Sequence, residues 1–397
     1  MVKKNYYYHK WYERYGFYKN IKSNSIVLHA ASVGETLSII PLVNILKHYY
    51  PSTSILITNI TFTGKMIVNN YLSYVDNIYL PYDIRFFINK FINHVKPKIF
   101  IIVETELWPN LIKLLNKRNI PIILINARIS DSSFRKYKII SSFMSNILNN
   151  IHYVFAQSIL DSNRFKSLGI TSNKLEVINN LKFDIYLTKN ILIESVKLRF
   201  KWLLHNNRPT LIASSTHPGE EIIILKAYKK LIRKFPNLLL IIAPRNIKRI
   251  KELIYLISKN NLSYIIFNKQ ITLNKQHHIL LVNTIGDLLL LYGISDIAII
   301  GGSLLNYGGH NPLEAIVHII PIIVGRYTNN FHDVYHKLKK NNSVIIVNSL
   351  DSLIKEINNL LYNKAYYHYR TCYTNLVLNK YCGSSKKIVH LIDKYVK

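Results

Sequence analysis

Cysteine is scarce in this sequence, and so are the residue clusters that usually hold a metal ion. Two cysteines, Cys372 and Cys382, occur among 397 residues, and they lack the CxxC spacing of metal and redox sites. Their small number excludes a disulfide scaffold and favours a reducing compartment. No His, Asp or Glu cluster has metal-ligand spacing either. We therefore expect neither a metal ion nor a cofactor.

Long apolar runs and the common nucleotide-binding signatures are also missing. No uninterrupted apolar stretch reaches the ~18 residues that a membrane span needs, since the longest candidate, Leu288–Leu305, contains Asp296. The N-terminus is basic and aromatic rather than a secretory signal. Neither Gly-x-Gly-x-x-Gly nor a Walker A motif occurs, which disfavours a dinucleotide-dependent dehydrogenase and a P-loop ATPase.

Acidic residues are few relative to basic ones. The 52 Lys and Arg residues against 21 Asp and Glu give a formal net charge of +31. Such an excess is typical of proteins that bind nucleic acid, an anionic membrane or an anionic substrate, although biased codon usage also enriches Lys, Asn, Ile and Tyr. The basic residues are scattered, and no zinc-finger, RNP or basic-region pattern is present, so we expect no nucleic-acid partner.

Short β-branched runs alternate with amphipathic stretches, which predicts α/β units around parallel sheets. The strands of the first half are predicted at Ser25–His29, Ser54–Asn59, Asn77–Tyr79, Ile99–Val103, Ile122–Asn126, Tyr153–Ala156 and Leu175–Val177. Those of the second half are predicted at Thr210–Ser214, Leu238–Ala243, Tyr264–Phe267, Ile279–Val282, Ile297–Ile300, Ile322–Val324 and Ser343–Val347. The predicted helices between them include Thr36–His48, Leu107–Asn119, Glu220–Lys234 and Pro312–His318.

This order of elements predicts two Rossmann-like domains facing each other across a cleft. We place an N-terminal domain at residues 1–195 and a C-terminal domain at residues 205–380, with the boundary across the charged helix Ile191–Leu203. The last helix, within residues 383–397, is expected to pack back on the N-terminal domain.

A polar cluster follows the first predicted strand. Ser32 and Glu35 have the spacing of the N-cap and N3 positions, so a capping box is one interpretation. The other is a general base, because a carboxylate beside a helix N-terminus stays ionised near neutral pH and can accept a proton from a sugar hydroxyl. The residues alone leave both open.

Charged side chains also follow later strands of the first half. Glu104 and Glu106 come after the apolar run Ile99–Val103, where a carboxylate is costly unless it is paired or functional; a salt bridge within the domain is the alternative. Arg128 follows the next strand and can meet Glu104 or an anionic substrate. Lys182 is ambiguous, since most such lysines are merely solvated.

In the second half, a Gly-rich turn after Ile297–Ile300 leads into a helix. We predict Asn311 at the N-cap, Pro312 at the first helical position and Glu314 at N3. Backbone N–H groups and the helix dipole at such a turn favour a phosphate or a ribose, and a plain cap is the alternative. Arg245, which follows the predicted strand Leu238–Ala243, can bind a phosphate through its guanidinium.

Eight motifs, read in chain order, resemble those of the 3-deoxy-D-manno-octulosonic acid (Kdo) transferases of Gram-negative lipopolysaccharide assembly. They are HAASVGE, ETELWPN, NARIS, AQS with DSNRF, NLKFD, STHPGEE, APR, and GGSL with GGHNPLE. The resemblance implies the two-domain GT-B glycosyltransferase architecture. It also implies transfer of Kdo from CMP-Kdo to a lipid A precursor (lipid IVA), with inversion at the anomeric carbon.

The resemblance further implies roles for single residues. Glu35 would be the proton acceptor, and Glu104 and Lys182 would stabilise the transition state. The implied CMP contacts are Pro244, Arg245, Ile285, Gly286, Asp287, Asn311, Pro312, Leu313 and Glu314. The sequence departs from the family at Ile285-Gly286-Asp287, where members typically read Met-Gly-Glu, and at Asn180, which replaces a usual glycine.

Two alternatives stay open beside the resemblance. A GT-B enzyme that uses a different nucleotide sugar is disfavoured by the SVGE and ETELWPN pair. A non-catalytic basic protein that binds RNA or a membrane would leave the carboxylate clusters unexplained.

The family normally begins with an apolar membrane anchor, and we expect this chain to start just after it. The segment Lys3–Lys22 is rich in Lys, Arg, Tyr and Trp, which favour an anionic leaflet and the headgroup region. We therefore expect a peripheral protein on the cytoplasmic face of the bacterial inner membrane, although these residues can instead pack on the first domain.

Overall fold

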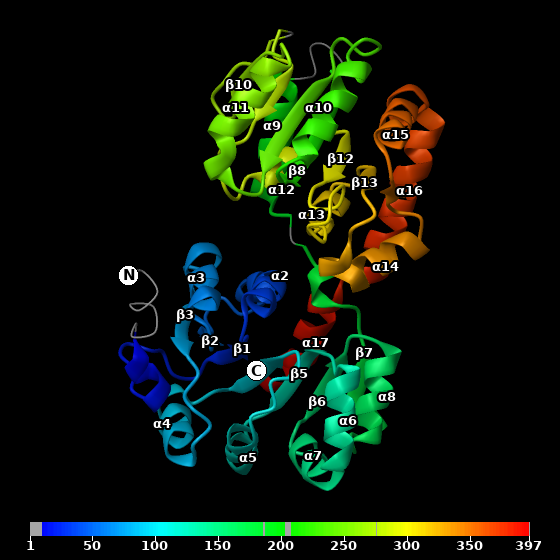
Figure 1. Ribbon diagram of the computed structural model, residues 1–397. Coiled ribbons are helices and arrows are strands. Elements are labelled where there is room, and N and C mark those ends of the chain that lie inside the picture. The colour runs from blue at the N-terminus through cyan, green and yellow to red at the C-terminus, as the bar shows by residue number, and fades with distance from the viewer. Residues whose placement is uncertain (1–9, 186, 203–207, 275, 397) are drawn as a thin grey trace. The chain divides into compact units, whose positions relative to one another are not determined.

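The chain divides into two compact units (Figure 1). The computed structural model describes residues 10–185, 187–202, 208–274 and 276–396. The first unit runs to Asp184 and also includes the C-terminal segment from Tyr381, and the second unit is Ile185–Lys380. Within the described residues each unit has one seven-stranded sheet, and every strand pairing in both sheets is parallel.

The first sheet has the strand order β3-β2-β1-β4-β5-β6-β7. Its strands are β1 (Ile26–His29), β2 (Ile55–Asn59), β3 (Asp76–Tyr79), β4 (Ile99–Val103), β5 (Ile122–Ala127), β6 (Tyr153–Ala156) and β7 (Leu175–Val177). The central strands β1, β4 and β5 are buried along their whole length, since helices cover both faces, and this explains their continuous apolar runs.

Helices pack on both faces of the first sheet. One core contains side chains of α4 (Arg85–Val95), α5 (Pro109–Lys117), α7 (Ser141–Leu148) and α8 (Ile159–Ser167). The opposite core contains side chains of α2 (Val33–Tyr49), α3 (Phe62–Tyr71) and α17 (Ser384–Val396). The remaining elements are α6 (Asp131–Ile139) and the 3₁₀ helices η1 (Trp11–Tyr15), η2 (Ser172–Lys174) and η3 (Leu181–Phe183).

The C-terminal helix α17 belongs to the first unit, and Figure 1 shows it, in red, beside the strands of that unit. Ile388, Ile392 and Val396 lie in the same buried cluster as the residues of β1 and α2. The Asp184 carboxylate accepts hydrogen bonds from the backbone N–H groups of Gly383, at 2.6 Å, and of Ser385. Apolar burial and this carboxylate cap together hold α17 on the sheet.

The second sheet has the strand order β10-β11-β9-β8-β12-β13-β14. Its strands are β8 (Thr210–Thr216), β9 (Leu239–Pro244), β10 (Tyr264–Ile266), β11 (Ile279–Leu281), β12 (Ile297–Ile300), β13 (Ile322–Val324) and β14 (Ile345–Ile346). All fourteen predicted strands are present with small shifts at their ends. The predicted α/β class with two Rossmann-like parallel sheets is confirmed.

The helices of the second unit follow its strands in the usual alternation. They are α9 (Lys189–Trp202), α10 (Glu220–Leu231), α11 (Ile250–Lys259), α12 (Leu288–Tyr292), α13 (Leu313–Ile316), α14 (His332–Lys340), α15 (Leu350–Tyr362) and α16 (Lys364–Tyr381), with the 3₁₀ helices η5 (Ile247–Arg249) and η6 (Asn329–Phe331). The core of this unit joins α10, α11 and α15 to one face of the sheet.

Each sheet has a point where the direction of strand addition reverses. In the first sheet the chain runs from β1 to β2 and β3 on one side, and β4 then lies on the other side of β1. In the second sheet β9 and β12 lie on opposite sides of β8 in the same way. The loops after β1 and β4, and after β8 and β12, therefore border the crevices in which open parallel sheets bind ligands.

Candidate active site residues in the two units

Glu35 lies in the first turn of α2, directly after β1. Its carboxylate accepts hydrogen bonds from the backbone N–H of Ala31 and from the hydroxyl of Ser32, both at 2.7 Å. The Ser32 hydroxyl also accepts from the Glu35 N–H at 3.3 Å, so the predicted N-cap arrangement is present. Each carboxylate oxygen has one donor, which leaves lone pairs for a further proton.

Glu104 is the first residue after β4, and its backbone is strained. Its φ of 59° falls in the left-handed region, which residues other than glycine rarely adopt. A hydrogen bond of 2.9 Å from the Glu104 N–H to the Ile125 carbonyl keeps the backbone in this conformation. Strained residues that the surrounding structure holds in place are concentrated at active sites and binding sites.

The electrostatics of Glu104 place four charged groups close together. Burial raises the pKa of the Glu104 carboxyl, Lys182 opposes this shift, Glu35 adds to it, and Arg128 opposes it. The structure therefore brings together Glu35, Glu104 and Lys182, as well as Arg128. Burial also raises the pKa of Glu106, with Glu35 contributing in the same direction, so Glu106 borders this cluster too.

Lys182 lies in η3, and a chain of hydrogen bonds positions its turn. The Asn180 side chain accepts from the Lys182 N–H at 2.9 Å and donates to the Gln157 side chain at 3.1 Å. The Asn126 side chain accepts from the Leu181 N–H at 3.1 Å. The φ of Asn180 is −59°, which does not require glycine, so the asparagine fits here and adds two hydrogen bonds.

Glu35 and Glu104 follow β1 and β4, the two strands at the switch point of the first sheet. Ligands of open parallel sheets bind at the carboxyl ends of the strands at such a point. Their position and the neighbouring cations make this cluster the candidate catalytic centre of the first unit. The cluster can hold an anionic group with Lys182 and Arg128, and it can accept a proton on a carboxylate.

Arg245 and Glu314 come together in the second unit. Arg245 is exposed at the end of β9, and its N–H donates to the Thr216 carbonyl of the neighbouring strand at 3.0 Å. Burial raises the pKa of the Glu314 carboxyl, and the nearby Arg245 opposes this shift. Pro244, the last residue of β9, is buried next to Arg245.

The helix after the Gly-rich turn starts one residue later than predicted. Leu313 is its first residue, Pro312 takes the N-cap position, and α13 is only four residues long. The Asn311 side chain still accepts a hydrogen bond, from the Leu313 N–H at 3.1 Å. The predicted helix start was wrong by one residue, but the Asn311 side chain accepts from the amide two residues ahead, as the side chain of an N-cap residue does.

The segment Ile285–Asp287 presents a different surface. Ile285 is 80% exposed, and a Cβ added to Gly286 would meet no atom within 4 Å. The Asp287 carboxylate accepts from the Thr284 hydroxyl at 2.6 Å and lies 3.6 Å from the Lys269 ammonium. Asp287 therefore interacts with Thr284 and Lys269 of its own unit.

Glu220 organises the loops of the second switch point, and the sequence analysis gave it no role. Its fully buried carboxylate accepts from the backbone N–H groups of His217 (2.9 Å), Gly302 (2.7 Å) and Leu304 (2.9 Å). It therefore ties the loop after β8 to the loop after β12. The STHPGEE motif contains Glu220 and could have pointed to it. The motif does not show which backbone groups Glu220 binds, because one of them, Gly302, lies 82 residues further along the chain.

Two histidines that the sequence analysis also missed meet at the same place. The Nε2 atoms of His217 and His310 are 2.7 Å apart, and the ring of Tyr307 stacks on His217 at 4.3 Å between ring centres. Burial lowers the pKa of His310 to about 4, and Arg245 and His217 add to this shift. Arg245 therefore lies close to this pair as well as to Glu314.

Comparison with known proteins identifies the family. The family model described as 3-deoxy-D-manno-octulosonic-acid transferase (kdotransferase) matches residues 9–185. A 3-deoxy-D-manno-octulosonic acid transferase of Haemophilus influenzae is 40% identical over 357 residues, which cover 89% of this chain and 83% of the relative. This chain belongs to the Kdo transferase family.

A second relative agrees with that membership, and a solved structure has the same fold. The 3-deoxy-D-manno-octulosonic acid transferase of Rickettsia typhi is 31% identical over 347 residues, covering 85% of this chain and 73% of the relative. The crystal structure of UDP-GlcNAc 2-epimerase from Neisseria meningitidis matches with a TM-score of 0.59 at 16% sequence identity. The match covers 93% of this chain and 100% of the epimerase chain. This structural match shows the GT-B fold alone.

This Kdo transferase family member carries an aromatic–basic surface on its first unit. The surface comprises Trp11, Tyr15, Phe17, Tyr82, Phe86 and Lys90. Trp11, Phe17 and Phe86 are 54%, 54% and 60% exposed, and the Lys90 ammonium lies 3.9 Å from the ring centre of Phe17 and 4.6 Å from that of Phe86. Rings of this kind with a neighbouring cation favour a membrane headgroup region.

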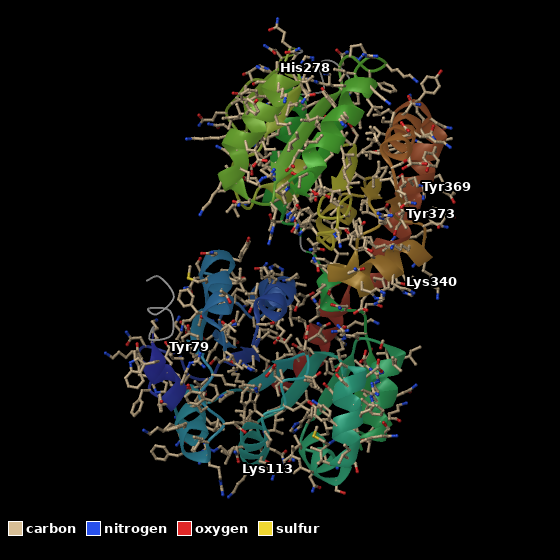
Figure 2. All side chains as sticks on the ribbon, in the orientation of Figure 1. Tyr79, Lys113, His278, Lys340, Tyr369 and Tyr373 are labelled. Carbon is tan, nitrogen blue, oxygen red and sulfur yellow. The ribbon has the colours of Figure 1, made fainter. Side chains whose placement is uncertain are left out.

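The start of this surface is fixed to the sheet by Glu13. Its buried carboxylate accepts from the Lys65 ammonium at 2.7 Å and from the Tyr79 N–H at 2.8 Å. The Arg14 guanidinium lies 4.6 Å from the ring centre of Tyr79, which Figure 2 labels. Part of the predicted Lys3–Lys22 segment thus packs on the unit and part is exposed, while Lys3, Lys4 and Tyr6–Tyr8 lie outside the described residues.

The described residues include neither a membrane-spanning helix nor a metal-binding cluster. Among them no helix is both long and apolar enough to cross a membrane. Within the same residues, no group of three or more His, Cys, Asp or Glu side chains could hold a metal ion.

Proposed function

We propose that this chain transfers Kdo from CMP-Kdo to a lipid A precursor, lipid IVA, with inversion at the anomeric carbon. The observation that carries the proposal is the cluster of Glu35, Glu104 and Lys182 at the switch point of the first sheet. An inverting transfer needs one base on the acceptor side and cations for the anionic donor, and this cluster contains both.

Glu35 is the proposed base. The acceptor hydroxyl gives its proton to the Glu35 carboxylate while its oxygen forms a bond to the anomeric carbon of Kdo. The bond between that carbon and the phosphate oxygen breaks, and CMP leaves with the electron pair. The hydrogen bonds from Ala31 and Ser32 keep the carboxylate in one orientation, so little reorganisation accompanies proton transfer.

Glu104 and Lys182 are proposed to stabilise the transition state. Positive charge develops on the sugar ring as the bond to CMP breaks. The negative charge of the Glu104 carboxylate would stabilise that positive charge. Kdo also has a carboxylate on the reacting carbon, for which Lys182 and Arg128 are suitable partners. The raised pKa of Glu104 agrees with a site kept partly dry, where such interactions are strong.

The second unit is proposed to bind CMP. Arg245 would contact the phosphate, and Pro244 and the 311–314 turn would contact the rest of the nucleotide. Glu314 is half-buried and its carboxyl lies close to Arg245, and a carboxylate in this position can accept hydrogen bonds from ribose hydroxyls. Ile285–Asp287 would lie against the nucleotide through an exposed backbone rather than through the typical methionine and glutamate side chains.

The aromatic–basic surface is proposed to hold the protein on the cytoplasmic face of the inner membrane. A basic residue near an anionic leaflet contributes about 1 kcal/mol, so Lys90→Ala should weaken binding to anionic vesicles about fivefold. The exposed Tyr255 of α11 is a suitable control, and Tyr255→Ala should leave binding unchanged. Binding that is insensitive to lipid charge in co-sedimentation would contradict this role.

The donor and acceptor are tested by mass spectrometry of reaction products. Purified protein incubated with lipid IVA should give a product heavier by Kdo with CMP-Kdo, and no product with UDP-sugars. A product formed from a UDP-sugar but not from CMP-Kdo would refute the proposal. The anomeric configuration of the product, read by nuclear magnetic resonance, tests the inversion separately.

A further inference from the structure

The histidine pair at the second switch point has the geometry of one shared hydrogen bond. His217 follows β8 and His310 lies in the loop after β12, and these two strands are neighbours in the sheet. The Nε2 atoms are 2.7 Å apart, while the ring centres are 5.0 Å apart and the ring planes differ by 3°. Rings so arranged meet edge to edge, with one proton between the two nitrogens.

The surrounding loops hold both rings in place. The His217 N–H donates to Glu220, and the Tyr307 ring covers the imidazole of His217 at 4.3 Å. The His310 carbonyl accepts from the Tyr335 hydroxyl at 2.7 Å. A Cβ on Gly302 would lie 2.9 Å from a carbon of the His310 ring, so glycine is needed there for the ring to fit.

This arrangement can take one extra proton without moving. In the neutral pair, one imidazole donates through Nε2–H and the other accepts at Nε2 while it carries its proton on Nδ1. A further proton on the free Nδ1 makes an imidazolium that donates the same hydrogen bond, now charge-assisted and stronger. A second added proton would put hydrogens on both facing nitrogens and break the bond. The two rings therefore titrate as one unit.

Burial, with nearby arginines adding to it, lowers the pKa of both histidines of the pair. Burial lowers the pKa of His217, Glu220 and Glu221 oppose this shift, and Arg245 and Arg249 add to it. The pKa of His310 is lowered to about 4 by burial, with Arg245 and His217 adding to the shift. An anion bound at Arg245 would offset the repulsion from that guanidinium and would itself attract a proton to the pair.

We propose that the His217–His310 pair takes up one proton from solvent when the phosphate of a cytidine nucleotide binds beside Arg245. The inference rests on the proposed CMP site and adds a coupling between donor binding and protonation. No covalent bond of the nucleotide changes in this step. Because binding and protonation are linked, CMP affinity should fall as the pH rises, by up to about tenfold per pH unit.

Uptake or release of a proton on binding distinguishes the histidine pair from the phosphate as the group that titrates. A phosphate monoester has a second pKa of about 6, and binding to a cation lowers that pKa, so the phosphate releases protons on binding. Proton uptake would therefore come from protein groups. Cytidine, which lacks the phosphate, should bind without uptake.

Titration calorimetry of CMP into the full chain tests this coupling. Two buffers of different ionisation enthalpy, used at the same near-neutral pH, give the number of protons exchanged. The wild type should take up a fraction of a proton, at most one, per CMP. His310→Gln and His217→Gln, whose amides can keep a neutral hydrogen bond, should each remove the uptake and flatten the pH dependence of affinity. His368→Gln, an exposed histidine of α16, should keep both.

The outcomes are distinguishable. CMP binding without proton uptake, or with an uptake that persists in both glutamine variants, overturns the coupling and leaves the proposed donor site standing. Failure of wild-type protein to bind CMP overturns the donor site itself. Melting curves for both variants show which of them is folded, and a single folded variant is enough to decide between these results.

Discussion

Replacing Glu35 by glutamine tests the central step of the proposed mechanism. The substitution keeps the size of the side chain but removes its ability to accept a proton. General base catalysis contributes about 10²–10⁴-fold, so turnover should fall by that factor, equivalent to about 2.7–5.5 kcal/mol in the activation barrier. CMP affinity should be unchanged, because the CMP site proposed above is built from residues of the second unit.

The structure also sets the expected cost to stability. The Glu35 carboxylate accepts from Ala31 and from Ser32, and a glutamine has one carbonyl oxygen for these two donors. One charge-assisted hydrogen bond is worth about 1.5–3 kcal/mol, and a negative charge in the first turn of a helix about 0.3–1 kcal/mol. Glu35→Gln should therefore lower the free energy of unfolding by roughly 2–4 kcal/mol.

A second carboxylate of the first unit provides a matched control. Asp161 caps α8 through Ser158 as Glu35 caps α2 through Ser32, it accepts from the Ile129 N–H at 3.0 Å, and both acids are 7% exposed. Asp161→Asn should lose a similar stability and keep most of its turnover. If the two variants lose stability and turnover in parallel, Glu35 acts as a cap and not as a base.

Initial rates of Kdo transfer, with product measured by mass spectrometry, give the turnover of both variants. Urea unfolding followed by circular dichroism gives their stabilities. Near-normal turnover of a folded Glu35→Gln variant would refute the assignment outright.

Other substitutions test separate parts of the structure. Arg245→Ala should weaken CMP binding by about 1.5–3 kcal/mol in calorimetry, and Arg233→Ala, an exposed arginine of the same unit, should not; equal effects would refute the phosphate contact. Glu104→Gln should raise the free energy of unfolding near neutral pH, because burial raises the pKa of the native carboxyl and makes its ionised form costly. The gain in stability should vanish below the pKa of the unfolded chain, about 4.3, and a gain that does not depend on pH would refute this cause. Ile392→Ala should cost about 2–5 kcal/mol in urea unfolding if α17 is part of the first core, and a negligible cost would show that it is not.

The positions of the strands followed from the sequence because they depend on local pattern. A strand buried on both faces of a parallel sheet needs a continuous apolar run, and runs such as Ile99–Val103 have this property whatever their neighbours are. Polar residues directly after such runs predicted where side chains for chemistry would lie. The N-cap at Ser32 was likewise local, since its partner is three residues away. The capping contact of Asn311 was local as well and is present, although the helix begins one residue later than predicted.

Only the tertiary structure decided which of these loops are neighbours. Strand order places the loops after β1 and β4 together, although Glu35 and Glu104 are far apart in the chain, and it also brings Lys182 to them. The 2.7 Å contact between His217 and His310 joins residues separated by 93 positions. Hydrophobic patterns place a segment in a strand but do not specify which strand lies beside it, because many orders bury the same residues. The order that forms is decided by the packing of the whole unit, and the charges that shift a pKa are assembled only then.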